Sequence, residues 1–129
     1  MSPDKMFLPD FNAAHIESYF DNDFAVIMEV FKITDENLQD DLNEIQKAFE
    51  NKDFHSLKSG IHKIKPVFVI AGLTETEQEV NGFYSLCLRS SLFEEISNEY
   101  TELRPKLIRA KSLIHEQSNL FQSYPEKYL

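Results

Sequence analysis

The chain has 129 residues, enough for one domain with a substantial core and too few for two. Its 22 acidic residues outnumber its 13 basic ones and give a formal charge of −9, which argues against a nucleic-acid partner because phosphate binding needs clustered Lys and Arg. The single cysteine, Cys87, cannot form an internal disulfide and fits a reducing compartment. Residues 1–10 contain no apolar run of the signal-peptide kind, and no apolar stretch approaches the roughly 18 residues of a membrane span. We therefore expect a cytoplasmic protein.

The apolar residues follow a helical period almost throughout, and glycine and proline are scarce, which favours long helices. A short helix is predicted at residues 12–20. Asp21 or Asn22 is the expected N-cap of a long helix that reaches about residue 50. Its apolar stripe consists of Phe24, Met28, Phe31, Leu38, Leu42, Ile45 and Phe49. Thr34 and Asp35 interrupt the stripe, so a break at that point is the alternative.

A turn at residues 51–53 is expected to end in Asp53 as the N-cap of a third helix. The apolar stripe of this helix consists of Phe54, Leu57, Ile61, Ile64, Phe68 and Ala71. Gly72 is the expected C-terminal glycine of the helix. Residues 74–77, with the sequence TETE, form an expected capping box that opens a fourth helix. The buried side of the fourth helix is expected to contain Val80, Phe83, Tyr84 and Cys87.

Residues 91–94, with the sequence SLFE, form a second expected capping box and open a fifth helix that runs to about residue 116. Its expected core residues are Leu92, Ile96, Tyr100, Leu103, Leu107 and Ile114. Pro105 should kink this helix, because proline removes one backbone hydrogen bond. From Ser118 onward we expect a loosely held, flexible tail beside a core of residues 12–117. The pattern predicts a single all-α domain, an antiparallel four-helix bundle with a short extra N-terminal helix across one end.

The third predicted helix carries a basic face around a histidine. No Asp or Glu occurs between Phe54 and Leu73, although the chain as a whole is acidic. At about 100° per residue, His62 points away from the apolar stripe. Lys58 and Lys65 lie within about 60° of it, one turn to either side. The outward face is expected to comprise His55, Lys58, His62, Lys65, Val69 and Gly72.

This face suits the binding of a phosphoryl group. An exposed imidazole is substantially neutral at pH 7, so that a ring nitrogen is free to attack phosphorus. The phosphoryl group brings about two negative charges, which Lys58 and Lys65 can offset. Each such contact is worth about 1 kcal/mol or less in exposed surroundings. That amount tunes a transfer equilibrium without driving it.

The run from His62 to Lys65, with the sequence HKIK, followed by Gly72 and Leu73, resembles the signature of histidine-containing phosphotransfer (HPt) domains. In that family a histidine, a lysine at plus three and a glycine at plus ten lie on one helix of a four-helix bundle. The resemblance covers roughly residues 12–117. It implies that His62 becomes the phosphohistidine and that Lys65 steadies the phosphoryl group. It also implies that Gly72 keeps the helix end close to its neighbour.

The resemblance implies a phosphorelay carrier in two-component signal transduction, without kinase activity of its own. HPt domains take a phosphoryl group from the aspartyl-phosphate of a response-regulator receiver domain and pass it to another. The receiver, for which a hybrid histidine kinase is one source, supplies the magnesium, so no cofactor is expected. The chain itself has no glycine-rich phosphate loop. We expect a monomer whose partner-binding residues are Lys58, Pro66, Val69, Gly72 and His55.

One departure from the family pattern is Pro66, which stands where the family usually has glycine at plus four. A proline there removes the helical donor to the carbonyl of His62 and costs about 3 kcal/mol in an unrelieved helix. We expect a local bend and an altered docking surface. Pro66 therefore keeps a second hypothesis open, an HPt-like adaptor that docks a receiver or helical partner without phosphotransfer. A self-associating structural bundle is a third.

Other residues allow competing or simpler interpretations. His55 also has a lysine at plus three, Lys58, but its plus-ten residue is Lys65 and not glycine. His15 and His115 have no metal-like companions, so no zinc site is expected. The remaining residues are interpreted as core packing or as a solvated first turn of a helix: Cys87, Phe83, Tyr84, Glu75, Glu77 and Glu79.

Overall fold

The fold is entirely helical over residues 7–123, the part of the chain that this computed structural model describes. The helices are α1 (Ala13–Tyr19), α2 (Phe24–Glu50), α3 (Phe54–Ile70), α4 (Thr74–Arg89) and α5 (Ser97–Ser123), with a 3-10 turn, η2, at Phe93–Glu95. The all-α class is thus confirmed. None of the helices within residues 7–123 combines the length and the apolar character that crossing a bilayer requires.

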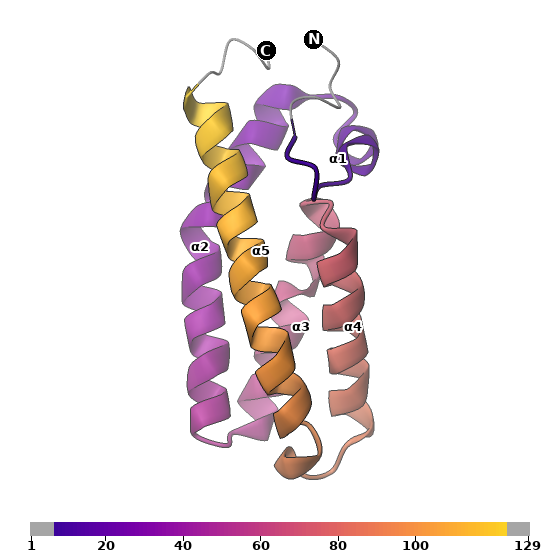
Figure 1. Cartoon of the computed structure of the whole chain (residues 1–129), viewed down its shortest axis with the longest axis vertical. Helices are drawn as coiled ribbons and strands as arrows, with labels where there is room; N and C mark the ends of the chain where they lie inside the picture. Colours follow the sequence, from indigo (N-terminus) through magenta and orange to yellow (C-terminus); the bar gives the residue numbers. More distant parts are fainter. Residues whose placement is uncertain (1–6, 124–129) are drawn as a thin grey trace.

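The long helices lie alongside one another as a bundle, and the short α1 lies at the end where α3 passes into α4 (Figure 1). α2 packs against α3 and α5, and α4 packs against α3 and α5, so the core lies between all of them. The apolar stripe expected on the third helix is confirmed, because Leu57, Ile61, Ile64 and Phe68 are fully buried. α3 is consequently held with one face inward and the opposite face toward solvent.

Local capping explains where two of the helices begin. Asp53 caps α3 as expected, since its Oδ1 accepts a hydrogen bond from the backbone N–H of Ser56 at 3.1 Å. Hydrogen bonds from the side chain and then the backbone of Ser56 lower the pKa of the Asp53 carboxyl. The cap of α2 is Asp23, not Asp21 or Asn22, both of which have positive φ in the preceding turn. α2 is one continuous helix, so the alternative break at residues 34–35 is wrong.

Neither expected capping box forms. The N-cap of α4 is Leu73, which provides no side-chain hydrogen bond, and Thr74 is already the first helical residue. At the second position Glu95, not Glu94, accepts hydrogen bonds from the backbone N–H groups of Ser91 (3.3 Å) and Leu92 (3.0 Å). The backbone is extended at Leu92, so the chain makes η2 first and α5 begins only at residue 97.

The C-terminal part of α5 is packed, which corrects the end expected at residue 116 and the tail expected from Ser118. α5 continues to Ser123, and both Ser118 and Phe121 are buried. The ring of Phe121 meets those of Phe7 and Phe31 edge to face, each at 5.6 Å between centroids. Residues 124–129 of the expected tail lie outside the described part. Pro105 lies within α5 without ending it.

Candidate functional site

His62 lies in the middle of α3 and is exposed, as the helical wheel predicts. Its neighbours Ile61 and Ile64 are fully buried, so their packing fixes the direction in which the imidazole points. We call His62, Lys58, Lys65 and the α4 residue Tyr84 the His62 surface. The side chains of this surface determine what the imidazole can do.

Both lysines beside His62 rest on aromatic rings. The Nζ of Lys58 lies 4.5 Å from the centroid of the Phe54 ring, and the Nζ of Lys65 lies 4.5 Å from that of Tyr84. Among residues 7–123, neither lysine forms an ion pair with a carboxylate. Each ammonium therefore keeps a charge that an incoming anion can use.

Lys63 differs from these two lysines. Its Nζ lies 3.0 Å from Oδ1 of Asp41 on α2, and this hydrogen bond and charge raise the pKa of Lys63. The positive charge of Lys63 is thus already compensated. Although α3 itself contains no acid, α2 supplies one on the Lys63 side and none to Lys58 or Lys65.

Tyr84 is the residue of this surface that sequence reasoning missed. Its half-buried ring lies 5.3 Å from the His62 ring, centroid to centroid, with 34° between the planes. The same ring carries the ammonium of Lys65. Tyr84 is therefore more than the core packing residue that the sequence suggested. Its meeting with His62 follows from how α4 packs on α3, and no local motif signals it.

Gly72 is buried, which corrects its assignment to the outward, partner-binding face. Its φ of +70° is in the left-handed region, and its carbonyl accepts a 2.8 Å hydrogen bond from the backbone N–H of Asn12. A Cβ at Gly72 would lie 2.7 Å from Cγ1 of Ile16. Glycine is required here because α1 closes directly over the turn between α3 and α4.

The other expected partner-binding residues lie around this surface in different settings. Pro66 is exposed and α3 continues through it. Val69 is half-buried, and its carbonyl lies 3.0 Å from Nε2 of His15 on α1. His55 is exposed and lines an open groove of about 490 Å³ between α2 and α3. The alternative assignment, in which His55 with Lys58 at plus three takes the place of His62 with Lys65, stays a prediction.

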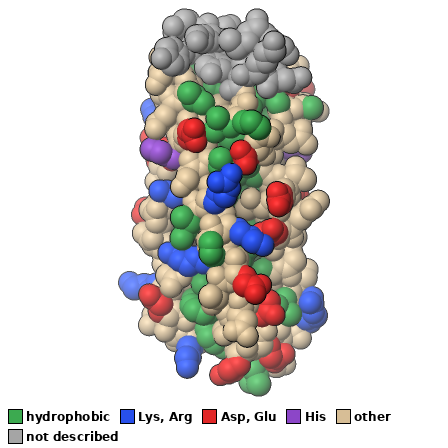
Figure 2. All heavy atoms as spheres, in the orientation of Figure 1, with side chains coloured by type: hydrophobic (Ala, Val, Ile, Leu, Met, Phe, Trp, Pro, Cys, Tyr) green, Lys and Arg blue, Asp and Glu red, His purple; other side chains and the backbone are tan. Residues whose placement is uncertain are grey.

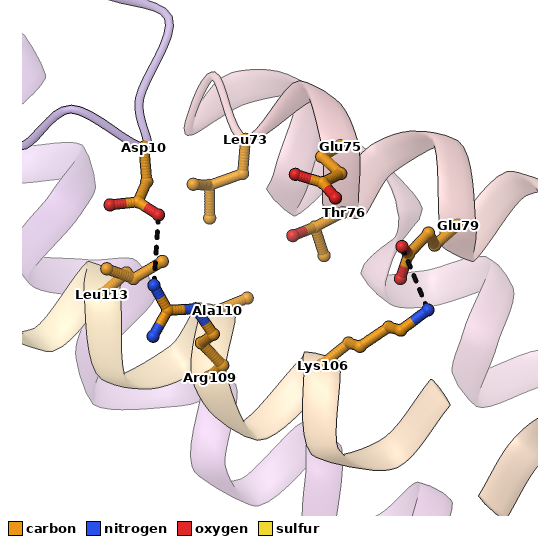
Figure 3. Close-up of a pocket in the computed structure, with 9 residues that line it drawn as sticks. All are labelled: Asp10, Leu73, Glu75, Thr76, Glu79, Lys106, Arg109, Ala110 and Leu113. Carbon is orange, nitrogen blue, oxygen red and sulfur yellow. Dashed lines mark hydrogen bonds and ion pairs between the residues drawn. The ribbon is translucent and has the colours of Figure 1, made fainter. Parts of the chain in front are cut away.

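A separate pocket of about 180 Å³ lies between the N-terminal segment, the start of α4 and α5 (Figure 3). Two ion pairs border it: Arg109 with Asp10 at 3.3 Å, and Lys106 with Glu79 at 3.1 Å. Its cations are therefore already compensated. Figure 2 likewise shows acidic and basic side chains interspersed over the face that α5 presents. No residue of α3 lines this pocket. Because its two cations are already paired with carboxylates, the pocket has less free positive charge for binding an anion than the His62 surface has.

The remaining histidine and thiol chemistry of the described part is limited. His115 Nδ1 lies 2.9 Å from Oδ2 of Asp35, an ion-pair geometry that joins α5 to α2. Burial raises the pKa of the Cys87 thiol to about 11, so it stays protonated at neutral pH. Residues 7–123 contain no group of three or more His, Cys, Asp or Glu side chains placed to hold a metal ion.

The chain was also compared with known proteins. No family model, no curated protein and no solved structure matches it. The exposed imidazole of His62, the two uncompensated lysines and the ring of Tyr84 therefore carry the functional interpretation.

Proposed function

We propose that this protein is a phosphorelay carrier of the HPt kind, an antiparallel four-helix bundle with a short extra N-terminal helix, in which His62 accepts and donates a phosphoryl group. The observation that carries the proposal is an exposed imidazole in mid-helix, flanked by Lys58 and Lys65, which have no carboxylate ion-pair partner among residues 7–123. Such a surface favours the binding of a phosphoryl group, with about two negative charges, over the binding of neutral or cationic groups.

The chemistry is a transfer between two side chains. A ring nitrogen of His62 donates its lone pair to phosphorus while the P–O bond to the aspartate of a receiver domain breaks, and that aspartate leaves as a carboxylate. The reverse step hands the phosphoryl group on. Positioning and charge stabilisation contribute most of the catalysis in such transfers. Lys65 supplies charge at His62, the receiver supplies magnesium, and the carrier needs neither a cofactor nor kinase activity of its own.

The proposed partner is the receiver domain of a response regulator or of a hybrid histidine kinase. We propose that this protein binds it as a monomer in the cytoplasm. The exposed side chains of His55 and Pro66 and the half-buried Val69 surround the His62 surface and would form the contact. Gly72 would act from beneath, by holding the end of α3 against α1. No nucleic acid or membrane is part of the proposal.

A transfer assay tests the proposal. A panel of receiver domains carrying radiolabelled aspartyl-phosphate is mixed with wild type, His62→Gln and the matched control His55→Gln. We expect acid-labile, alkali-stable label on wild type and His55→Gln, and none on His62→Gln. Lys65→Met should label more slowly than Lys63→Met, because the charge of Lys63 is already paired with Asp41. Full labelling of His62→Gln would refute the assignment.

A binding-only adaptor is the second candidate, and the exposed Pro66 beside His62 favours it. A rigid proline ring stands where a partner's loop must approach the imidazole. The adaptor predicts that a receiver binds in calorimetry while wild type acquires no acid-labile phosphate. Labelling of Pro66→Gly but not of wild type would identify the proline as the barrier.

A further inference from the structure

We propose that Tyr84 is the positioning residue of the His62 surface: its ring holds the ammonium of Lys65 beside His62 before a phosphoryl group arrives. This inference rests on the proposed function in so far as the group to be bound is a phosphoryl group. It assigns a role to a residue of α4, a helix to which the HPt-like signature on α3 does not extend.

One ring serves two side chains of α3. The Tyr84 centroid lies 4.5 Å from Nζ of Lys65 and 5.3 Å from the centroid of His62. The negative face of an aromatic ring attracts an ammonium group, and the tilted contact restricts the imidazole. Because His62 and Lys65 are three residues apart on a helix, they project on the same side. A ring from the neighbouring helix can therefore hold both together.

The contact between the Lys65 ammonium and the Tyr84 ring is weak enough to break when a phosphoryl group binds. A lysine side chain loses much rotamer freedom when it is fixed in one geometry, and the Tyr84 ring has already imposed part of that restriction. No carboxylate of residues 7–123 pairs with Lys65, so no stronger contact has to be broken. A charge-assisted hydrogen bond to a phosphoryl oxygen is stronger than the ring contact. We therefore expect the ammonium to leave the ring when His62 is phosphorylated.

The chain contains its own comparison. Lys58 rests on Phe54 at the same 4.5 Å, one turn before His62, but the aromatic contact of the Phe54 ring is with Phe93 at 6.5 Å. Phe54 thus holds a lysine without touching the imidazole. If any lysine–ring pair near His62 sufficed, the two would be equivalent. The shared contact with His62 makes Tyr84 the one that matters for the reaction.

The experiment uses phosphoramidate, a small donor that needs no receiver domain. A His62 nitrogen bonds to phosphorus as the P–N bond of phosphoramidate breaks and ammonia leaves. The rate constant is followed by phosphorus NMR for wild type, Tyr84→Phe, Tyr84→Leu and Phe54→Leu. We expect Tyr84→Leu to react two- to fivefold more slowly, which corresponds to about 0.5–1 kcal/mol. Tyr84→Phe and Phe54→Leu should stay close to wild type.

Two further measurements separate positioning from a structural effect. The ε-methylene protons of Lys65 should show an upfield ring-current shift that phosphorylation removes and Tyr84→Leu abolishes. In a double-mutant cycle, Lys65→Met should cost much less in the Tyr84→Leu background than in wild type. Additive effects, an unchanged rate in Tyr84→Leu, or an equally slow Tyr84→Phe would each overturn the proposal.

Failure of the inference and failure of the proposed function give different results. If receivers label wild type and Tyr84→Leu at equal rates, the carrier function is supported and the positioning role of Tyr84 is refuted. If no receiver labels wild type, but phosphoramidate labels it at a rate that depends on Tyr84, the positioning role is supported and the relay function is refuted.

Discussion

Replacing Gly72 with alanine tests how the turn between α3 and α4 supports the site. Gly72 has φ +70°, and a Cβ there would lie 2.7 Å and 2.9 Å from Cγ1 and Cδ1 of Ile16, and 3.1 Å from the carbonyl oxygen of Asn12. Ile16 is fully buried, so it has little room to retreat. The 2.8 Å hydrogen bond from Asn12 to Gly72 would be strained as α1 is pushed away.

The magnitude follows from two terms. An L-residue in the left-handed region costs about 1–2 kcal/mol, and forcing a methyl group into a packed interior typically costs about 1–3 kcal/mol. Gly72→Ala should therefore lower the free energy of unfolding by roughly 2–5 kcal/mol, a large part of the roughly 5–15 kcal/mol of an ordinary domain. Urea denaturation followed by circular dichroism at 222 nm measures the change.

Gly82→Ala is the matched control. Gly82 is an exposed residue inside α4, and a Cβ added there meets no atom within 4 Å. Alanine in a helix interior is favoured over glycine by about 0.5–1 kcal/mol, so this variant should be slightly more stable than wild type. If Gly72→Ala unfolds at the same urea concentration as Gly82→Ala, the inference that α1 leaves no room for a Cβ at residue 72 is refuted.

Two further predictions concern the core. Phe121→Ala should lower the free energy of unfolding by about 3–5 kcal/mol, because Phe121 is fully buried between Phe7 and Phe31; a loss below about 1 kcal/mol in urea denaturation would mean that the last turn of α5 is not packed. For Cys87, burial raises the pKa in the folded chain from 9.0 to about 11. A raised pKa means that the unfolded chain loses this proton first, so the stability is complete below about pH 9 and falls as the pH rises to about 11, by at most roughly 2–3 kcal/mol. Urea titrations over that range should show this fall in wild type and not in Cys87→Ala, and parallel curves would contradict it.

The helices and the direction of His62 could be predicted because both depend on local periodicity. Leu57, Ile61 and Ile64 recur at helical spacing, and all are buried, so the imidazole between them points outward. Asp53 caps α3 through a residue three positions away, which is also local. The expected capping boxes were wrong in position, because Leu73 precedes α4 without a side-chain hydrogen bond and Glu95, not Glu94, accepts from the backbone N–H groups of Ser91 and Leu92.

The sequence by itself determined the all-helical fold, the apolar stripe of the third helix and the histidine with lysines one turn to either side, since each of these depends on local periodicity. The expected core position of Leu92 was wrong, because that side chain is exposed before the start of α5. Only the tertiary structure decided which residues of other helices meet them. Tyr84 reaches His62 because α4 packs on α3, and Gly72 is buried because α1 folds back over the turn. Phe121 belongs to the core because Phe7, more than a hundred residues earlier, lies against it. Such contacts depend on how the helices are placed relative to one another. Side-chain packing across the whole core sets this placement, so it cannot be predicted from any short stretch of sequence.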